Sequence, residues 1–264
     1  MKVSILIPAR YASSRFPGKP LAPLSGVTGV AKSLIERSWE AARAVVGVEQ
    51  IFVATDDARI ADAARGFGAD VVMTSPDCAN GTERCADALR SIPETDLVVN
   101  LQGDAPLTPA WFIEDLIDAM RLRPEIDVAT PVLRCDREAL EGLLADRRAG
   151  RVGGTTAVFD RSGRALYFSK EVLPYVSQAY GVDDCPVFHH VGVYAYRPAA
   201  LGAYVDMEPG RLEREEGLEQ LRFLENGHPV HCVTVEARGA RFWELNNPGD
   251  TALIEAVLAE RGLI

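Results

Sequence analysis

Residues 3–20 read VSILIPARYASSRFPGKP, an apolar run followed by a basic loop. The run at 3–7 predicts a buried strand, and the loop that follows it carries Arg10, Arg15 and Lys19. Open α/β sheets bind their ligands at the carboxyl ends of their strands, where this loop begins. The stretch therefore predicts an α/β protein that binds a polyphosphate here, with an ordinary solvated loop as the alternative.

Charge is distributed unevenly along the chain. The sequence has a formal charge of −10, from 38 acidic and 28 basic residues, yet residues 1–35 hold five basic residues and no Asp or Glu. An acidic protein is a poor electrostatic partner for nucleic acid or an anionic membrane, whereas a local cluster of Arg and Lys suits a small anion. We therefore expect a small phosphate ligand, and no nucleic acid or membrane as a partner.

The composition is that of a globular protein. With 264 residues, of which 47% are hydrophobic, the chain can bury a full core as one domain or as one domain with an excursion. Its apolar runs are about five residues long, against roughly 20 for a bilayer span, and no signal-like segment precedes the first strand. The five cysteines are scattered without a C-x-x-C pair, which favours reduced thiols over a zinc site. These features predict a cytoplasmic location.

Strands and helices alternate through the first half of the chain. Short apolar runs predict further strands at 51–54, 70–73 and 97–101. Apolar residues at helical spacing predict helices around them, at 30–45, 58–67, 81–89 and 109–123. Repeated strand–helix units of this kind favour a doubly wound, mainly parallel sheet.

Polar residues follow the predicted strands. Asp56 and Asp57 come after the second strand, as active-site acids or, in the favoured interpretation, as the N-cap of the next helix. Gly81 and Thr82 open a helix whose backbone N–H groups can bind an anion or a base. Glu83 directly follows Thr82, and not three residues later, so a capping box with Thr82 does not account for its side chain.

The strand at 97–101 ends in the tight turn Gln102-Gly103-Asp104. A carboxylate in this place can hold a magnesium ion that bridges phosphates, because Mg²⁺ takes one or two carboxylates together with phosphate oxygens and water. The alternative role for Asp104 is a helix cap. Because Asp104 lies far ahead of Pro109, where the next helix is expected to begin, the metal role is favoured.

Three common motifs are missing from the sequence: G-x-G-x-x-G, G-x-x-x-x-G-K-[ST] and G-x-S-x-G. Hydride transfer on a dinucleotide, P-loop hydrolysis of ATP and serine hydrolysis are therefore disfavoured. The basic loop, the Gly-Thr helix start and the Gly-Asp turn remain as the candidate walls of a nucleotide site.

Several segments, taken in order, resemble one family. The first half contains PARYASSRFPGKPL, IFVATDD, MTSPDCANGTER and VVNLQGDAPL, and the second half adds GRALYFSKEVLPY, HHVGVYAYR and GLEQLRFLENG. This set resembles the 3-deoxy-manno-octulosonate (Kdo) cytidylyltransferases, and the resemblance covers most of the chain. Because several multi-residue motifs occur in the same order, the set is more specific than any one of them.

The resemblance implies a three-layer α/β/α sandwich of the nucleotide-diphospho-sugar transferase type. It also implies a reaction in which the anomeric hydroxyl of a 2-keto-3-deoxy sugar acid attacks the α-phosphorus of CTP and releases pyrophosphate, with Mg²⁺ as cofactor. Residues 1–264 would form a single cytidylyltransferase domain, with an excursion at about 155–235 that shapes the acceptor site and the contact of a homodimer.

The resemblance also assigns roles to individual residues. The catalytic residues would be Arg15, Lys19 and Asp104, with Lys19 meeting the charge that develops in the transition state. The residues that bind CTP would be Ala9, Arg10, Ser14, Gly81, Thr82 and Gln102. The residues that bind the acceptor would be Lys170, His190, Glu219 and Gln220. Asp104 would bind Mg²⁺, with Asn246 as a weak second ligand.

This chain departs from the family pattern at a few positions. Ala105 replaces the Glu of QGDEP, and Asn246 replaces the metal-binding Asp near the C-terminus with an uncharged carbonyl oxygen. Lys170 stands for an Arg, which loses the bidentate grip on a carboxylate, and Thr156 stands for a Lys. Because these changes fall on the acceptor and metal side, two alternatives stay open: another acidic acceptor, such as a different ulosonate or a phosphonate, and a CTP-binding protein without catalysis.

Overall fold

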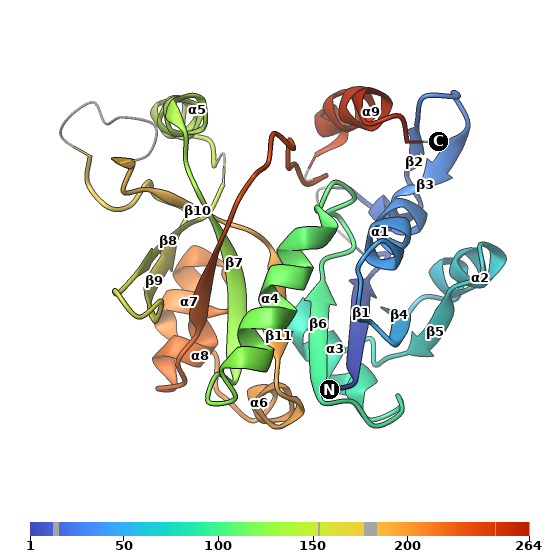
Figure 1. Cartoon of the computed structure of the whole chain (residues 1–264). Helices are drawn as coiled ribbons and strands as arrows, with labels where there is room; N and C mark the ends of the chain where they lie inside the picture. The colour runs from blue at the N-terminus through green and yellow to red at the C-terminus, as the bar shows by residue number, and fades with distance from the viewer. Residues whose placement is uncertain (13–15, 153, 177–183, 246, 264) are drawn as a thin grey trace. The chain divides into compact units, whose positions relative to one another are not determined.

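The computed structural model describes residues 1–12, 16–152, 154–176, 184–245 and 247–263 (Figure 1). The chain divides into two compact units: unit 1 comprises Met1–Glu114 and Arg238–Ile264, and unit 2 comprises Asp115–Ala237. The excursion expected at about 155–235 lies within unit 2. The single-domain organisation itself remains a prediction.

Unit 1 is built on a parallel sheet with the strand order β5-β4-β1-β6. The strands are β1 (Val3–Ala9), β4 (Gln50–Thr55), β5 (Asp70–Met73) and β6 (Leu97–Leu101). Strand β1 is buried along its whole length and pairs on both sides, with Leu6 opposite Phe52 on β4 and Asn100 on β6. The predicted strands and their parallel arrangement are therefore confirmed.

The connections in unit 1 define where a ligand can bind. The chain steps from β1 to β4 and on to β5 in one direction, and then returns past β1 to β6. Right-handed crossovers place α1 (Leu34–Arg43) and α2 (Ala58–Gly66) on one face of the sheet and α3 (Gly81–Leu89) on the other. The order of strands thus reverses between β1 and β6, and the crevice at such a switch point is the usual ligand site of this architecture.

The start of the first helix differs from its prediction. The expected helix at 30–45 begins only at Leu34, because Ala31–Ser33 forms strand β3, which pairs with β2 (Pro23–Ser25) in a small hairpin. The Ser33 side chain then accepts a hydrogen bond from the backbone N–H of Glu36, and caps the helix. The spacing of apolar residues predicted the helix correctly, but the same spacing continues by chance into the hairpin strand β3, which precedes it.

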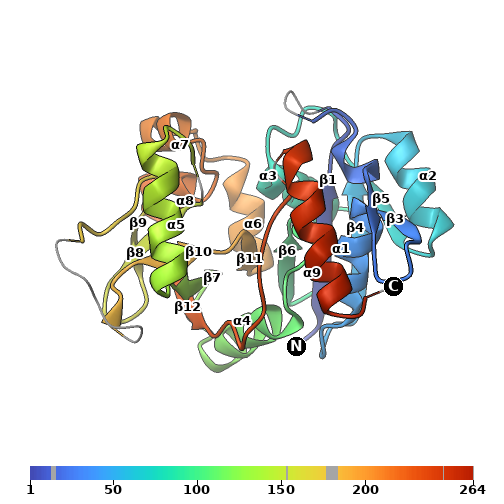
Figure 2. The ribbon, with the colours of Figure 1, turned by 90° about the horizontal axis from the view of Figure 1, so that it is seen from above.

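The C-terminal segment, residues 238–264, packs against the N-terminal part of unit 1. Helix α9 (Thr251–Glu260) follows a short 3₁₀ turn at Pro248–Asp250 and lies beside α1 in Figures 1 and 2 and beside β2 in Figure 1. Its apolar face joins a buried cluster with residues from β2, α1, the loop after β6 and the segment before the turn: Leu24, Leu34, Leu107, Leu245, Ile254, Val257 and Leu258. The end of the chain is therefore tied to the loops at the switch point.

Unit 2 contains a mixed, mostly antiparallel sheet. Its strands follow the order β11-β7-β10-β8-β9, and β12 pairs with β7 in parallel. Their bounds are β7 (Val128–Arg134), β8 (Thr156–Phe159), β9 (Ala165–Ser169), β10 (Phe188–His190), β11 (Val193–Tyr196) and β12 (His231–Val235). The helices of this unit are α5 (Arg137–Arg148), α6 (Pro198–Tyr204), α7 (Arg211–Glu216) and α8 (Leu221–Glu225).

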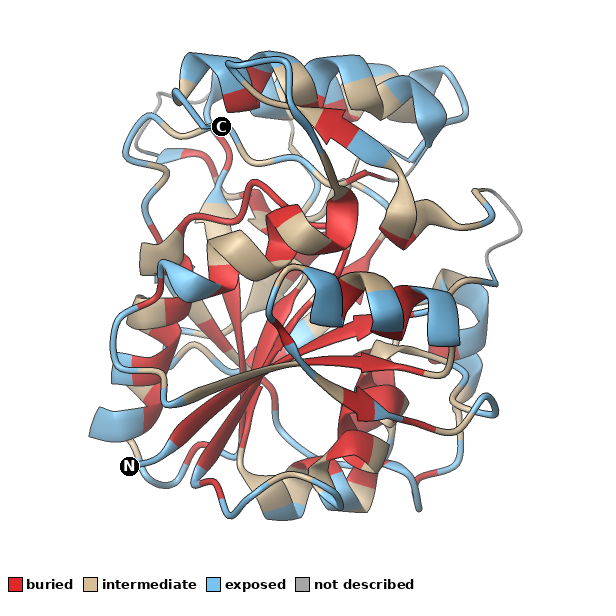
Figure 3. Ribbon diagram, turned by 90° about the vertical axis from the view of Figure 1, so that its right-hand side faces the viewer, coloured by how far each residue is buried: buried red, intermediate tan, exposed pale blue. Residues whose placement is uncertain are grey.

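Helix α4 (Ala110–Leu122) begins in unit 1 and ends in unit 2. Figure 3 shows buried strands flanked on both sides by helices whose outer faces are exposed, so the expected α/β fold with a layered sheet is confirmed. Parallel pairing is the rule in unit 1 and the exception in unit 2. In the described part of the chain, no helix combines the length and apolarity that crossing a bilayer requires.

Candidate active site

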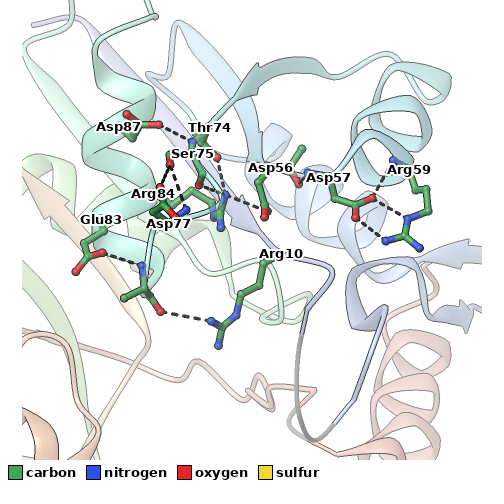
Figure 4. Close-up of polar contacts among 12 residues, drawn as sticks. Arg10, Asp56, Asp57, Arg59, Thr74, Ser75, Asp77, Glu83, Arg84 and Asp87 are labelled. Atoms are coloured by element: carbon green, nitrogen blue, oxygen red, sulfur yellow. Dashed lines mark hydrogen bonds and ion pairs between the residues drawn. The ribbon is translucent and has the colours of Figure 1, made fainter.

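The end of β1 meets the loop that precedes α3. Ala9 closes β1 and is buried, and the exposed Arg10 donates a hydrogen bond from Nη1 to the carbonyl oxygen of Ala79 at 3.4 Å. Figure 4 shows this guanidinium directed toward the loop that leads into α3. Arg10 therefore joins two of the three predicted walls of the nucleotide site.

Gly81 and Gln102 lie in contact across the same strand ends. A Cβ atom on Gly81 would stand 2.9 Å from Nε2 of Gln102, so only a glycine lets the Gln102 amide reach the helix start. Thr82 follows on the first turn of α3 and is fully buried. The structure thus brings together these three residues, which were predicted to bind the nucleotide.

A second glycine shapes the turn after β6. A Cβ atom on Gly103 would stand 2.7 Å from the carbonyl oxygen of Pro8, closer than a real side chain tolerates. The Gly103 carbonyl also accepts a hydrogen bond from Ser38 Oγ on α1 at 3.0 Å. Because this turn passes so close to β1, it directs Asp104 toward the loop that follows β1.

Lys19 and Asp104 form an ion pair at the switch point. Nζ of Lys19 lies 2.6 Å from Oδ2 of Asp104, and donates a second hydrogen bond to the carbonyl oxygen of Leu245 at 3.1 Å. The backbone N–H of Leu245 in turn donates to the carbonyl oxygen of Asp104 at 2.9 Å. The side chains of Lys19 and Asp104 are 18% and 25% exposed, so a ligand can still reach them.

Arg84 is a site residue that sequence reasoning missed. It is buried on α3, and its Nη1 donates to Thr74 Oγ1 at 2.5 Å and lies 3.1 Å from Oδ1 of Asp56 (Figure 4). This contact ties the ends of β4 and β5 to the first turn of α3. No local pattern in the sequence marks it, because its partners come from two other segments, the ends of β4 and β5.

Asp56 and Asp57, the two acidic residues that follow β4, have separate roles. Asp57 is the N-cap of α2, as predicted, since its Oδ1 accepts a hydrogen bond from the backbone N–H of Arg59 at 2.9 Å. The Arg59 side chain also donates to this carboxylate and holds the pKa of Asp57 below its ordinary value. Asp56 faces the other way, toward the buried Arg84, and serves no cap.

Glu83 does belong to the cap of α3, contrary to the sequence interpretation. The N-cap is Asn80, not Thr82, and its side chain accepts a hydrogen bond from the Glu83 backbone N–H at 2.8 Å. Glu83 lies three residues after this cap, and its Oε2 accepts from the backbone N–H of Ala79 at 2.7 Å. The error came from placing the cap two residues too late.

His190 and Gln220 gather around Tyr194 in unit 2. Nε2 of His190 lies 2.9 Å from Thr130 Oγ1, and the Tyr194 hydroxyl donates to Oε1 of Gln220 at 3.0 Å. The rings of His190 and Tyr194 are 5.5 Å apart. Gln220 is buried, and its Nε2 has no hydrogen-bond partner among the described residues. A buried amide that keeps an unused donor is suited to bind a polar ligand.

Burial fixes the protonation of His190. It lowers the pKa of His190 to about 3, so the imidazole is neutral at physiological pH. The Thr130 hydroxyl donates its own proton to the carbonyl oxygen of Val193 at 2.7 Å, and therefore accepts from the ring. The neutral His190 then carries its proton on Nε2 and leaves Nδ1 as an acceptor.

This depressed pKa gives a pH-dependent stability. The unfolded chain takes up a proton at His190 near pH 6.5, while the folded protein does not until about pH 3. The stabilisation is therefore complete above pH 6.5 and is lost as the pH falls toward 3, at about 1.4 kcal/mol per pH unit. Between pH 6 and pH 4, the free energy of unfolding measured with urea should fall less steeply with decreasing pH in His190→Gln than in the native protein, by about 1.4 kcal/mol per pH unit. An identical slope in the variant would contradict the assignment.

Lys170 and Glu219, the other two predicted acceptor residues, make different contacts. The backbone N–H of Lys170 donates to Oε2 of Glu216 at 2.9 Å, and its Nζ approaches Gly217. The carbonyl oxygen of Glu219 accepts from the Tyr204 hydroxyl at 3.0 Å. Glu216 was not predicted, although it also accepts from Ser169 Oγ at 2.6 Å and organises the segment that carries Lys170.

Three predicted residues, Ser14, Arg15 and Asn246, lie outside the described residues. Two family departures are buried in the structure: Ala105 is fully enclosed in the turn after β6, and Thr156 donates its hydroxyl to the Glu171 carbonyl at 2.7 Å. The predicted CTP residues that are described belong to unit 1, and the predicted acceptor residues belong to unit 2.

The fold and the described part of the site define a class of protein. A parallel sheet with a switch point, a basic loop after β1, a glycine-started helix and a carboxylate turn after β6 are the parts of a nucleotide-binding α/β enzyme that handles phosphates. What the arrangement offers chemically is positioning and charge neutralisation, as nucleotidyl transfer requires.

Comparisons with known proteins identify the family. A family model described as cytidylyltransferase matches residues 4–230. The chain is 43% identical over 263 residues to the 3-deoxy-manno-octulosonate cytidylyltransferase of Maricaulis maris, covering 99% of both chains. It is 42% identical over 263 residues to the 8-amino-3,8-dideoxy-manno-octulosonate cytidylyltransferase of Shewanella frigidimarina, covering 98% of this chain and 99% of that one.

A solved structure agrees with the sequence matches. The fold superimposes with a TM-score of 0.83 and 32% identity on CMP:2-keto-3-deoxy-manno-octonic acid synthetase complexed with CTP, covering 99% of this chain and all of the other. The chain therefore belongs to the cytidylyltransferase family of nucleotidyltransferases. The resemblance drawn from the ordered motifs is confirmed.

Proposed function

We propose that the protein transfers CMP from CTP to 3-deoxy-manno-octulosonate or a closely related sugar acid, with release of pyrophosphate. The observation that carries this proposal is the meeting of Lys19, Asp104 and the Leu245 carbonyl at the switch point of the sheet. The relatives support it through the activity for which they are named, in chains that match this one along nearly its whole length.

The proposed reaction is an in-line displacement at the α-phosphorus. The anomeric hydroxyl oxygen forms the new bond to phosphorus, the bond to the oxygen between the α- and β-phosphates breaks, and the hydroxyl proton is released. Arg10, Arg15 and Lys19 would bind the phosphates, and Lys19 would meet the negative charge that grows on the departing pyrophosphate. Ala9, Ser14, Gly81, Thr82 and Gln102 would line the nucleotide pocket.

The residues at the switch point fit a magnesium ion. Oδ2 of Asp104 and the carbonyl oxygen of Leu245 both contact the ammonium of Lys19, so two hard oxygen donors already converge on one positive charge. When bound, Mg²⁺ would neutralise charge on the triphosphate. Asp104 would hold it, and Asn246, the residue after Leu245, would be a weak further ligand.

The residues of unit 2 supply hydrogen bonds suited to a sugar acid. His190 offers a neutral ring, and Gln220 offers an unused amide donor among the described residues. Lys170 would pair with the carboxylate of the acceptor as a single point charge, and Glu219 would accept from a hydroxyl group. These roles follow from the family resemblance and from the burial of His190 and Gln220.

The relatives suggest a second acceptor. Proteins named for the 8-amino sugar match this chain at 42–43% identity, as well as those named for 3-deoxy-manno-octulosonate do. An 8-amino group is a cation that an acidic side chain in the pocket would recognise. Pyrophosphate release should therefore be measured with CTP, Mg²⁺ and each of the two sugars in competition, and with other ulosonates and phosphonates as a panel.

Turnover with either octulosonate supports the proposal, and the ratio of the two kcat/KM values identifies the acceptor. Turnover only with a sugar outside this pair would show that the protein is a cytidylyltransferase with a different acceptor. If CTP binds in a calorimeter while no member of the panel releases pyrophosphate, the protein is a nucleotide-binding protein without this activity.

Gly81→Ala should weaken CTP binding. The added Cβ would stand 2.9 Å from Gln102 Nε2, and displacing that amide should raise KM for CTP by roughly tenfold, with a smaller change in kcat. Gly66→Ala is the control, because a Cβ there meets nothing within 4 Å at the end of α2. Equal KM values for CTP in the two variants would contradict the placement of Gln102 in the nucleotide pocket.

A cytoplasmic location and a homodimer are further parts of the proposal. None of the five cysteines, Cys78, Cys85, Cys135, Cys185 and Cys232, forms a disulfide, which suits a reducing compartment. The dimer is supported by the family resemblance, and light scattering of the purified protein in solution tests it. A mass equal to one chain of 28.6 kDa at micromolar concentration would contradict the dimer.

A further inference from the structure

The position of the Lys19 ammonium is defined by oxygens from two distant segments. Nζ lies 2.6 Å from Oδ2 of Asp104, on the turn after β6, and 3.1 Å from the carbonyl oxygen of Leu245, near the C-terminus. These segments are joined by the hydrogen bond from Leu245 N–H to the Asp104 carbonyl at 2.9 Å. The two oxygens therefore form one site for a positive charge.

Both oxygens are held in place by packing. The Leu245 side chain is fully buried in the cluster that α9 forms with Leu34 and Leu107, which fixes its backbone. The turn that carries Asp104 is fixed by the close approach of Gly103 to Pro8 and by the bond from Ser38. The long, unbranched Lys19 side chain is the movable partner of this contact.

Chemistry makes the ammonium and a divalent metal ion alternatives here. Magnesium binds carboxylate oxygens at about 2.1 Å and prefers hard oxygen donors, as offered by Asp104 and Leu245. Nζ already lies 2.6 Å from the same carboxylate oxygen, and two cations that share it would repel one another at short range. A metal ion can take this position only after Lys19 has left it.

We propose that in the nucleotide-free protein the Lys19 ammonium occupies the cation position formed by Oδ2 of Asp104 and the carbonyl oxygen of Leu245, and that a divalent metal enters this position only when a nucleotide phosphate has drawn Lys19 away. This inference rests on the proposed function, which supplies the phosphate. It makes Lys19 a placeholder that keeps the metal site closed until the nucleotide arrives. By linkage, metal and nucleotide then strengthen each other's binding.

The test uses the metal alone. Mn²⁺, which accepts the same oxygen ligands, is titrated into the full-length protein without nucleotide or acceptor, and the free ion is followed by electron paramagnetic resonance. Lys19→Met should bind Mn²⁺ about tenfold more tightly than the native protein, or better, because no charged hydrogen bond has to be broken. Lys19→Gln takes its place if the Met variant does not fold.

Two variants control the result. Lys32→Met removes the same charge from unit 1 and takes one of its two cationic partners from the Glu40 carboxylate, and it should leave Mn²⁺ affinity unchanged. Lys19→Met combined with Asp104→Asn should lose the gain. The inference is overturned if Lys19→Met binds no more tightly than Lys32→Met, or if the gain survives without the Asp104 carboxylate. Because no CTP is present, this outcome is independent of the pyrophosphate assay for the proposed function.

Discussion

Lys19→Ala is expected to lower kcat for pyrophosphate release by about 10²-fold or more, because the lost ammonium meets charge that grows only in the transition state. In the nucleotide-free protein the ammonium already lies at the switch point, where it contacts Asp104 at 2.6 Å and the Leu245 carbonyl oxygen at 3.1 Å, within reach of a bound phosphate. Steady-state kinetics with saturating CTP and acceptor separate this loss of kcat from a change in KM.

Lys32→Ala is the matched control for charge. Lys32 lies in the same unit and pairs with Glu40 instead of with a predicted site residue, so its loss should leave kcat within about twofold of the native value. A near-normal kcat in Lys19→Ala would contradict the proposed role of Lys19 in the transition state. Folding of both variants is checked by circular dichroism, since Lys19 is partly exposed and does not belong to the apolar core.

Glu213→Ala is expected to destabilise unit 2 by about 3–5 kcal/mol, because it leaves a buried guanidinium without its counter-ion. Glu213 accepts two hydrogen bonds from Arg222, at 2.8 Å from Nε and 2.7 Å from Nη2, and both residues are buried. Arg222 lies on α8, two residues after the N-cap Gln220, so the pair also fixes the helix that begins at this predicted acceptor residue. Urea unfolding followed by circular dichroism measures the loss.

Asp118→Ala is the control for this ion pair. Asp118 contacts Arg121 at 2.9 Å on the surface of α4, where both side chains are about half exposed or more, and surface pairs of this kind add little stability. The Glu213 variant should lose far more stability than the Asp118 variant. Similar urea midpoints for the two variants would contradict the expected contribution of the buried Glu213–Arg222 pair to stability.

Local patterns predicted the fold of unit 1 well. The strands at 70–73 and 97–101 have the bounds that the apolar runs gave, and the helix expected to end at Leu89 does so. These elements are specified by neighbouring residues: an apolar run for a buried strand, and a polar cap with helical spacing for a helix. Local chemistry also explains the two errors, since a hairpin strand and a cap two residues upstream lie at element boundaries, where patterns overlap.

The candidate site was predicted only in part, for a physical reason. The basic loop, the glycine turn and the helix start are marked by residues that stand together in the sequence. The contact of Lys19 with the Leu245 carbonyl joins residues 226 positions apart, and it uses a backbone atom that every residue carries. The contact of the buried Arg84 with Asp56 likewise depends on how the ends of β4 and β5 meet the first turn of α3. Such contacts come from topology, which a sequence pattern does not record.

Unit 2 was the harder part. Its mixed sheet lacks the repeated strand–helix pattern of unit 1, and Glu216, which accepts from Ser169 and from the Lys170 backbone, stands in a charged run that resembles any solvated helix. His190 and Gln220 were identified by family resemblance. The structure adds the hydroxyl of Tyr194, which donates to Gln220, and the burial that keeps His190 neutral.

Phosphorus-31 NMR of a single reaction mixture tests the central claim most directly. With CTP, Mg²⁺ and 3-deoxy-manno-octulosonate or its 8-amino analogue, the account predicts one new phosphodiester resonance, from CMP joined to the sugar, and an equal amount of pyrophosphate. Both signals should vanish in Lys19→Ala over the same time. Conversion of CTP to CDP and phosphate, or unchanged CTP with both sugars, would contradict cytidylyl transfer by this protein.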